Sequence, residues 1–275
     1  MLRTIRILLI VFFVLVLIGA SILFYYNYTH NDVSKPVFQS DGDTMEVPVS
    51  VTRKELCAGL RAFDNVDGEI TDRIMVQSIS QFVSESTFRV RYIVFDNASN
   101  YATCERTVRY TDYVPPKFHL SKPMRFNVGE TVTFMDRITA EDCIDKNISD
   151  KLLLTESNVS NTTPGNYRAV VSVTNSMGDT AVLPLTVLVQ SRSPSAPVIE
   201  LSEYLVYQKA GQKQEFRSYL ASVTDPLAEG DVSEKSVKIN TKSLDRNTPG
   251  VYEVYYYYTG ASGETASAIL TVIVE

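Results

Sequence analysis

Three stretches of the chain alternate apolar and polar side chains with a period of two, at residues 88–95, 167–173 and 252–258. This alternation predicts half-buried β-strands, and no stretch after the N-terminal region keeps a helical period over three turns. The predicted inward faces are Phe88, Val90, Tyr92 and Val94, then Tyr167, Ala169, Val171 and Val173, then Tyr252, Val254, Tyr256 and Tyr258. Turn residues and a further alternating stretch follow each strand, so a strand–turn–strand ending occurs three times.

The alternating pairs belong to a repeat with a period of about 80 residues. Each copy opens on a proline followed by apolar residues: Pro36-Val37, Pro116-Lys117-Phe118 and Pro197-Val198-Ile199. The repeat predicts domains at 36–114, 115–191 and 197–275. Short strands separated by regular turns predict the fold class, which is all-β: three tandem immunoglobulin-like antiparallel β-sandwiches after one N-terminal transmembrane helix.

Short proline-bearing connectors at 114–116 and 191–197 join the copies. Connectors of this kind act as semi-rigid spacers. We therefore expect the three domains to stack end to end.

The N-terminal region is apolar and uncharged from Ile7 to Phe24. It predicts a transmembrane signal-anchor helix at 7–26, with a cytoplasmic tail at 1–6 and a stalk at 27–35. Arg3 and Arg6 precede the run, so the positive-inside rule keeps the N-terminus in the cytoplasm and the domains outside the cell. A cleaved signal peptide is the alternative, with a cleavage site near residues 19–21. Apolar residues continue to Phe24, which favours an uncleaved anchor in the cell membrane.

The first copy reads GLRAFDNVDGEIT at 59–71 and FRVRYIVFDNASNYATCERTV at 88–108. These blocks resemble the bacterial Ig-like surface repeat family, whose tandem β-sandwiches are of a kind also present in a pesticidal crystal protein. The second copy keeps the pattern loosely, with Cys143 and Lys146 at the positions of Asn65 and Gly68, and the third copy keeps less of it. The resemblance implies exported cell-envelope domains that act as spacers or adhesive modules and have no active site.

The net charge and the absence of catalytic motifs argue against two classes of function, nucleic-acid binding and enzyme catalysis. The net charge of −6 gives no support to nucleic-acid binding. The two histidines, His30 and His119, stand in no nucleophile or metalloprotease motif, so we expect no enzyme activity. An envelope glycan hydrolase stays open as an alternative, since a catalytic carboxylate pair is defined in space rather than in sequence.

Cysteines offer one candidate bond. Cys57 and Cys104 lie in the same copy, and an oxidising compartment would favour a disulfide between them. Two separate thiols are the alternative. Cys143 would then be unpaired, either as a free thiol or in a bridge between chains.

An acidic loop supplies candidate calcium ligands in Asp64, Asp67 and Glu69, together with Asp96 in a later turn. Calcium binds several carboxylate oxygens at once. Asp, Asn and Gly also build turns through their own backbone, and the later copies do not keep the set. Turn-building is the favoured interpretation, so we expect no cofactor, with calcium as the alternative.

Two tyrosines supply a binding candidate. Tyr255 and Tyr257 alternate with the inward-facing residues of the third copy, so we expect them to point outward. An aromatic pair that stabilises the sheet is the alternative. The sequence predicts a membrane-anchored extracellular stalk or adhesion protein, held in the lipid bilayer by its helix, with a protein or glycan partner. A non-catalytic accessory subunit of a cell-envelope assembly is the alternative.

Overall fold

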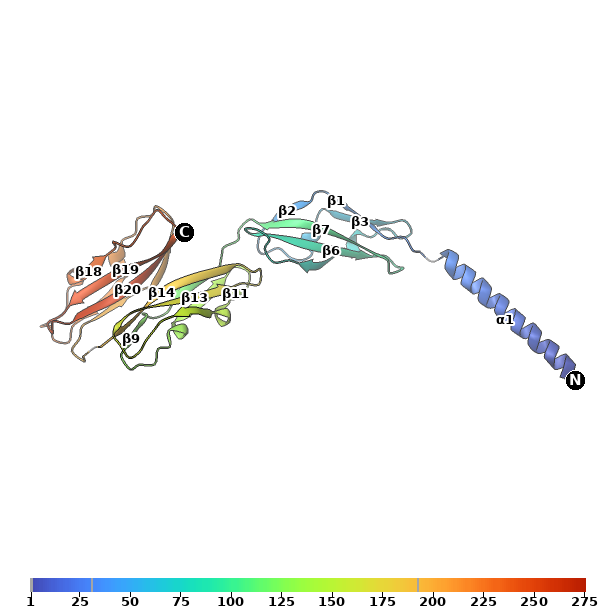
Figure 1. Cartoon of the computed structure of the whole chain (residues 1–275). Helices are drawn as coiled ribbons and strands as arrows, with labels where there is room; N and C mark the ends of the chain where they lie inside the picture. Colours follow the sequence, from blue (N-terminus) through green and yellow to red (C-terminus); the bar gives the residue numbers. More distant parts are fainter. Residues whose placement is uncertain (1, 31, 192) are drawn as a thin grey trace. The chain divides into compact units, whose positions relative to one another are not determined.

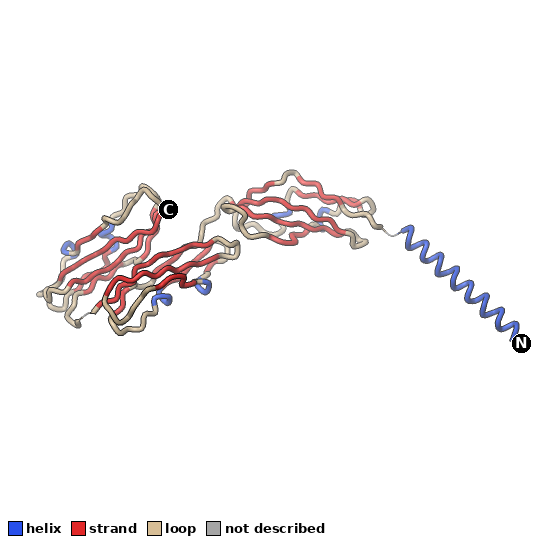
Figure 2. The backbone as a smooth tube through the Cα atoms, viewed as in Figure 1, coloured by secondary structure: helices blue, strands red, loops and turns tan. Residues whose placement is uncertain are grey.

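The computed structural model describes residues 2–30, 32–191 and 193–275, with residues 2 and 27–30 described by their backbone alone (Figures 1 and 2). Among these residues, one long helix, α1 (Leu2–His30), precedes the strands. It contains the predicted span 7–26 and continues through the first residues of the predicted stalk, whose residue 31 lies outside the described residues.

The segment Arg3–Tyr26 of α1 is apolar and long enough to cross a membrane, and none of it is buried by protein. At 1.5 Å per residue its 24 residues span about 36 Å, against about 30 Å of hydrocarbon. Its length and composition fit a membrane anchor or a signal sequence.

Three β-sandwiches follow, one for each sequence repeat. The first contains β1 (Val37–Ser40), β2 (Thr44–Val47), β3 (Leu60–Asp64), β4 (Gly68–Glu69), β5 (Met75–Ile79), β6 (Thr87–Phe95) and β7 (Tyr101–Tyr110). The second contains β8 (Lys117–Leu120), β9 (Arg125–Asn127), β10 (Ile138–Asp142), β11 (Lys146–Asn147), β12 (Leu153–Ser157), β13 (Gly165–Thr174) and β14 (Thr180–Gln190). The third contains β15 (Val198–Leu201), β16 (Leu205–Gln208), β17 (Leu220–Thr224), β18 (Lys238–Asn240), β19 (Gly250–Thr259) and β20 (Thr265–Val274).

One sheet of each sandwich has four strands, in the orders β2-β7-β6-β5, β9-β14-β13-β12 and β16-β20-β19-β18. The smaller sheet is built around β3, β10 or β17. Pairing is antiparallel except at one edge of each large sheet, where β2, β9 and β16 run parallel to β7, β14 and β20. The parallel edge arises because the chain leaves the small sheet after its first strand and crosses to the large one. The predicted Ig-like all-β fold is confirmed.

Most of the side chains that the alternation predicted to face inward are fully buried, whereas Tyr167, Tyr252 and Tyr258 are half-buried and pack against the cores. Phe88, Val90, Tyr92 and Val94 are fully buried, as are Ala169, Val171, Val173, Val254 and Tyr256. Tyr92 and Tyr256 occupy matching positions in the first and third sandwiches. Their hydroxyls donate to the Leu56 and Phe216 carbonyls, each in a short 3-10 turn over the core, at 2.8 and 2.6 Å. A tyrosine hydroxyl therefore ties a loop to the core in both sandwiches.

The chain divides into two compact units, Met1–Asp112 and Tyr113–Glu275. The first unit holds α1 and the first sandwich. The second unit holds the other two sandwiches, whose buried apolar side chains form one continuous cluster. For this pair, the expectation of domains stacked end to end is wrong, because the short connector lets the second and third sandwiches share buried surface.

Polar contacts join the second and third sandwiches as well. Arg125 binds Glu200 at 2.9 Å and also donates to the Ile199 and Ser267 carbonyls. Lys117 binds Glu275 and lies over the ring of Tyr207, whose hydroxyl accepts from the Phe118 N–H at 2.6 Å. The contact therefore combines apolar burial with paired charges and hydrogen bonds.

Candidate functional site

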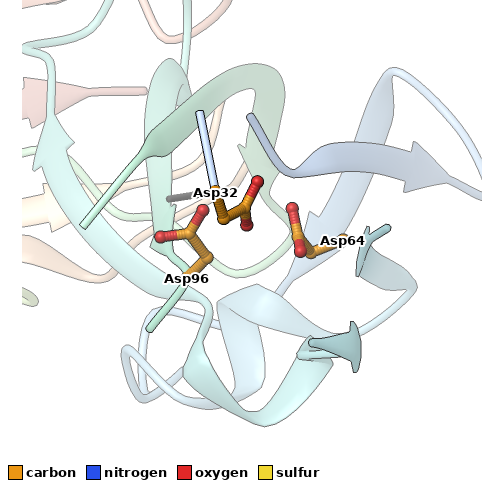
Figure 3. Close-up of side chains that lie close together, drawn as sticks. All are labelled: Asp32, Asp64 and Asp96. Carbon is orange, nitrogen blue, oxygen red and sulfur yellow. The ribbon is translucent and has the colours of Figure 1, made fainter. Parts of the chain in front are cut away.

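Three aspartates of the first unit converge at one end of the first sandwich. Asp32, Asp64 and Asp96 each present a carboxylate oxygen, and these three oxygens lie within 4.8 Å of one another. Figure 3 shows their carboxyl groups facing a common space. Asp64 and Asp96 are buried, and Asp32 is half-buried.

Different parts of the sandwich position these aspartates. Asp64 is the last residue of β3, and Asp96 directly follows β6. Asp32 precedes β1, in the segment that follows α1. The site thus joins two loops at the end of the sandwich to the chain that enters it.

The Asp64 carboxylate uses one of its oxygens for the local turn. Oδ1 accepts from the Asp67 and Val66 N–H groups at 3.0 and 2.8 Å, and these bonds lower the pKa of Asp64, so it stays ionised at neutral pH. Oδ2 is buried and has no hydrogen-bond partner among the described residues. One buried carboxylate oxygen therefore remains available for a ligand.

The other two aspartates have local partners. Asp96 accepts from the backbone N–H and the side-chain amide of Asn100, at 2.7 and 2.8 Å. Asp32 Oδ1 accepts from the Ser34 N–H at 2.9 Å, and its carbonyl accepts from the Asn100 amide at 3.1 Å. Asn100 thereby holds the Asp32 segment beside the β6–β7 turn.

The remaining calcium candidates lie outside this cluster. Asp67 accepts from the Asn97 N–H and side-chain amide at 2.7 and 2.6 Å and pairs with Arg73 at 3.5 Å. Glu69 accepts from the Thr71 hydroxyl at 3.0 Å and is exposed. Of the four predicted ligands, the structure brings together Asp64 and Asp96 and adds Asp32.

In the second sandwich, hydrogen-bond donors meet the carboxylate at the same position. Asp142 ends β10 as Asp64 ends β3, and Asn175 stands where the first sandwich has Asp96. The Asn175 amide donates to Asp142 at 3.0 Å and to the Tyr113 hydroxyl at 2.8 Å. Tyr113 in turn donates to Asp179 at 2.7 Å. Both Asp142 oxygens are thus satisfied, since the other accepts from the Ile144 and Asp145 N–H groups.

The third sandwich satisfies its carboxylate differently. Asp225 accepts from the Ala261 N–H at 2.7 Å and the Tyr258 hydroxyl at 3.3 Å, and its other oxygen accepts from Leu227. Gly260 stands where the first sandwich has Asp96. A Cβ at Gly260 would lie 2.7 Å from Asp225 Oδ2, so this position has no room for a second carboxyl group.

All three cysteines lie in the described part of the chain and are free thiols there, so the predicted Cys57–Cys104 bond is not formed in the structure and stays a prediction. Cys104 pairs across the sheet with Tyr92, whose hydroxyl reaches the carbonyl next to Cys57. Burial raises the pKa of Cys57, and raises that of Cys104 to about 11, which keeps both thiols protonated at neutral pH. The Cys143 thiol donates to the Val114 carbonyl at 3.2 Å.

The tyrosine pair lies beside the second sandwich. The Tyr255 and Tyr257 rings are parallel, with centroids 5.9 Å apart, and both residues are half-buried. Tyr255 lines an open groove of about 430 Å³ between the second and third sandwiches, together with Tyr167, Pro184 and Thr186. Tyr255 therefore points away from its own core but toward the neighbouring sandwich.

No protein-family model matches the chain. It is 26% identical over 255 residues to the pesticidal crystal protein Cry22Aa of Bacillus thuringiensis, a match that covers 88% of this chain and 33% of that protein. The chain thus spans about a third of the length of this relative.

Among solved structures, the chain is similar to the M60 catalytic domain with two CBM51 domains of Clostridium perfringens ZmpB. The identity is 12%, covering 87% of this chain and 30% of that one, with a TM-score of 0.25. It is also similar to the mouse cadherin-23 EC22-24 fragment, at 13% identity over 88% of this chain and 99% of that one, with a TM-score of 0.20. Likenesses this weak carry no functional argument. By sequence, the chain is similar to part of a pesticidal crystal protein.

Proposed function

We propose that the chain is a membrane-anchored protein whose three Ig-like sandwiches stand outside the cell and meet a protein or an envelope polymer. The observation that carries this proposal is α1, whose apolar span is unburied and is followed directly by β-sandwiches. Apolar side chains without a protein surface to cover them are stabilised by hydrocarbon. Arg3 and Arg6 at its start favour a cytoplasmic N-terminus.

Membership of the bacterial Ig-like surface repeat family is part of the proposal. The sequence blocks at 59–71 and 88–108 support it. The 26% sequence identity to a pesticidal crystal protein, over 88% of this chain, supports it as well. In this proposal the sandwiches hold the binding surface away from the membrane and bind the partner, and they catalyse no reaction.

Adhesion can be tested by expressing the full chain in a non-adherent bacterial host and measuring cell retention on immobilised glycans and proteins. We expect retention to rise with the full chain and to persist when α1 is replaced by an unrelated anchor. Retention that needs the native α1 would favour an accessory subunit of an envelope assembly, and unchanged retention on every surface would contradict adhesion.

Point substitutions are better suited to this test than deletion of the third sandwich, since deletion would expose the cluster that it shares with the second. If the third sandwich presents the binding surface, Tyr257→Ser should lower retention. The matched control is Tyr101→Ser, which changes an exposed tyrosine in the first sandwich. Equal losses in the two variants would contradict a surface on the third sandwich.

A further inference from the structure

We propose that Asp32, Asp64 and Asp96 bind a calcium ion, and that this ion ties the segment after α1 to the first sandwich. The inference is independent of adhesion, because it rests on the chemistry of one end of the first sandwich.

The observation that points to a ligand is the Asp64 side chain. Asp64 is 7% exposed, and its Oδ2 has no partner among the described residues. A buried carboxylate oxygen that has lost its water is unfavourable unless a donor or a cation meets it. In Figure 3 the Asp64 carboxyl group faces those of Asp32 and Asp96.

Charge and spacing both fit a divalent cation. Three carboxylates meet here, and no lysine or arginine nitrogen of the described residues forms an ion pair with them within 4.0 Å. Carboxylates this close repel one another unless a cation neutralises them. The three oxygens lie within 4.8 Å of one another, close enough for one calcium ion to contact all three at about 2.4 Å.

The other two sandwiches show how the same position is satisfied without a cation. In the second, the Asn175 amide donates to Asp142. In the third, the Ala261 N–H donates to Asp225, and Gly260 replaces the second carboxylate. Each of these N–H groups points the positive end of its dipole at the carboxylate that matches Asp64. In the first sandwich Asp96 stands where the second has Asn175, and the Asn97 N–H, which matches that of Ala261, donates to Asp67 instead. Neither donor reaches Asp64 Oδ2, so a cation takes that role.

The positions of the three aspartates in the chain indicate the structural role of the ion. Asp64 and Asp96 belong to loops of the sandwich, whereas Asp32 belongs to the segment between α1 and β1. One ion bound to all three would fix the entry of the chain into the sandwich. Calcium suits this better than magnesium, since it accepts irregular sets of oxygen ligands and water.

The test is a calorimetric titration of the full chain in detergent micelles, stripped with EGTA, with CaCl₂ and separately with MgCl₂. Hydrogen exchange measured with and without calcium locates the effect. We expect calcium binding, weaker magnesium binding, and slower exchange at residues 32–36 and 96–100 but not in the matching turn at 175–179. No binding at millimolar calcium, or equal affinity for magnesium, would overturn the proposal.

Matched variants test the ligands. Asp96→Asn copies Asn175, so its amide can donate to Asp64, and we expect at least a tenfold weaker calcium affinity in a folded chain. Asp32→Ala, outside the strands, should weaken binding similarly and covers the case in which the first variant misfolds. Asp142→Asn in the second sandwich is the control and should leave the affinity unchanged. Undiminished affinity in Asp96→Asn and Asp32→Ala, or an equal loss in the control, would overturn the assignment.

Discussion

Replacing Tyr256 with alanine should lower the free energy of unfolding of the second unit by about 4 kcal/mol, because it removes a fully buried aromatic ring and leaves a cavity. The substitution also leaves the Phe216 carbonyl without the hydroxyl that donates to it at 2.6 Å. Chemical denaturation of the full chain in detergent micelles, with separate probes on the two units, measures this loss.

Two control variants separate the causes of this loss. Tyr256→Phe keeps the ring and removes the hydroxyl, and it should cost about 1–2 kcal/mol. Leu227→Ala changes a side chain that is 53% exposed, and it should cost less than about 0.5 kcal/mol. A loss below 1 kcal/mol for Tyr256→Ala would contradict the assignment of Tyr256 to the core.

The second large effect is expected at Arg125. Its side chain is 12% exposed and bridges the second and third sandwiches through Glu200 and two carbonyls. Arg125→Ala should destabilise the second unit by about 2–3 kcal/mol, because three acceptors lose their donor; this is less than for a fully buried pair, since Glu200 is 42% exposed. The two sandwiches should also begin to unfold separately, which hydrogen exchange can follow.

Arg168→Ala is the matched control for Arg125. Arg168 pairs with Glu156 at 3.4 Å on an exposed part of the second sandwich, and its loss should cost less than about 0.5 kcal/mol. Equal effects of the two substitutions, or a second unit that stays fully cooperative in Arg125→Ala, would contradict a structural bridge at Arg125.

Much of the fold could be predicted because period-two alternation reports directly on which face of a strand is buried. Tyr92 and Tyr256 were expected in the core for this reason, and both are fully buried. Arg125 gave no such signal. A charged residue in a strand pattern suggests an exposed position, whereas the Arg125 side chain contacts Glu200, Ile199 and Ser267 of the neighbouring sandwich. A contact between two repeats depends on the surfaces of both. The alternation of apolar and polar residues within one repeat does not predict it.

The candidate site was predictable in part for a similar reason. Asp64 and Asp96 stand in turn motifs of the first repeat, so their proximity follows from the fold. Asp32 stands in no motif and precedes the repeat, and its place depends on how Asn100 holds its carbonyl. Asp67 and Glu69 looked equivalent to Asp64 in sequence, yet their oxygens serve Asn97, Arg73 and Thr71. Hydrogen bonding, rather than the number of acidic residues, selects the candidate ligands.

The most direct test of an anchored protein with external sandwiches is protease treatment of intact cells that express the full chain, followed by mass measurement of the membrane-bound product. We expect residues 36–275 to be digested from outside, while a fragment that begins at Met1 and contains α1 stays in the membrane. A full-length chain that resists protease until the cells are opened, or a released protein that lacks α1, would contradict it.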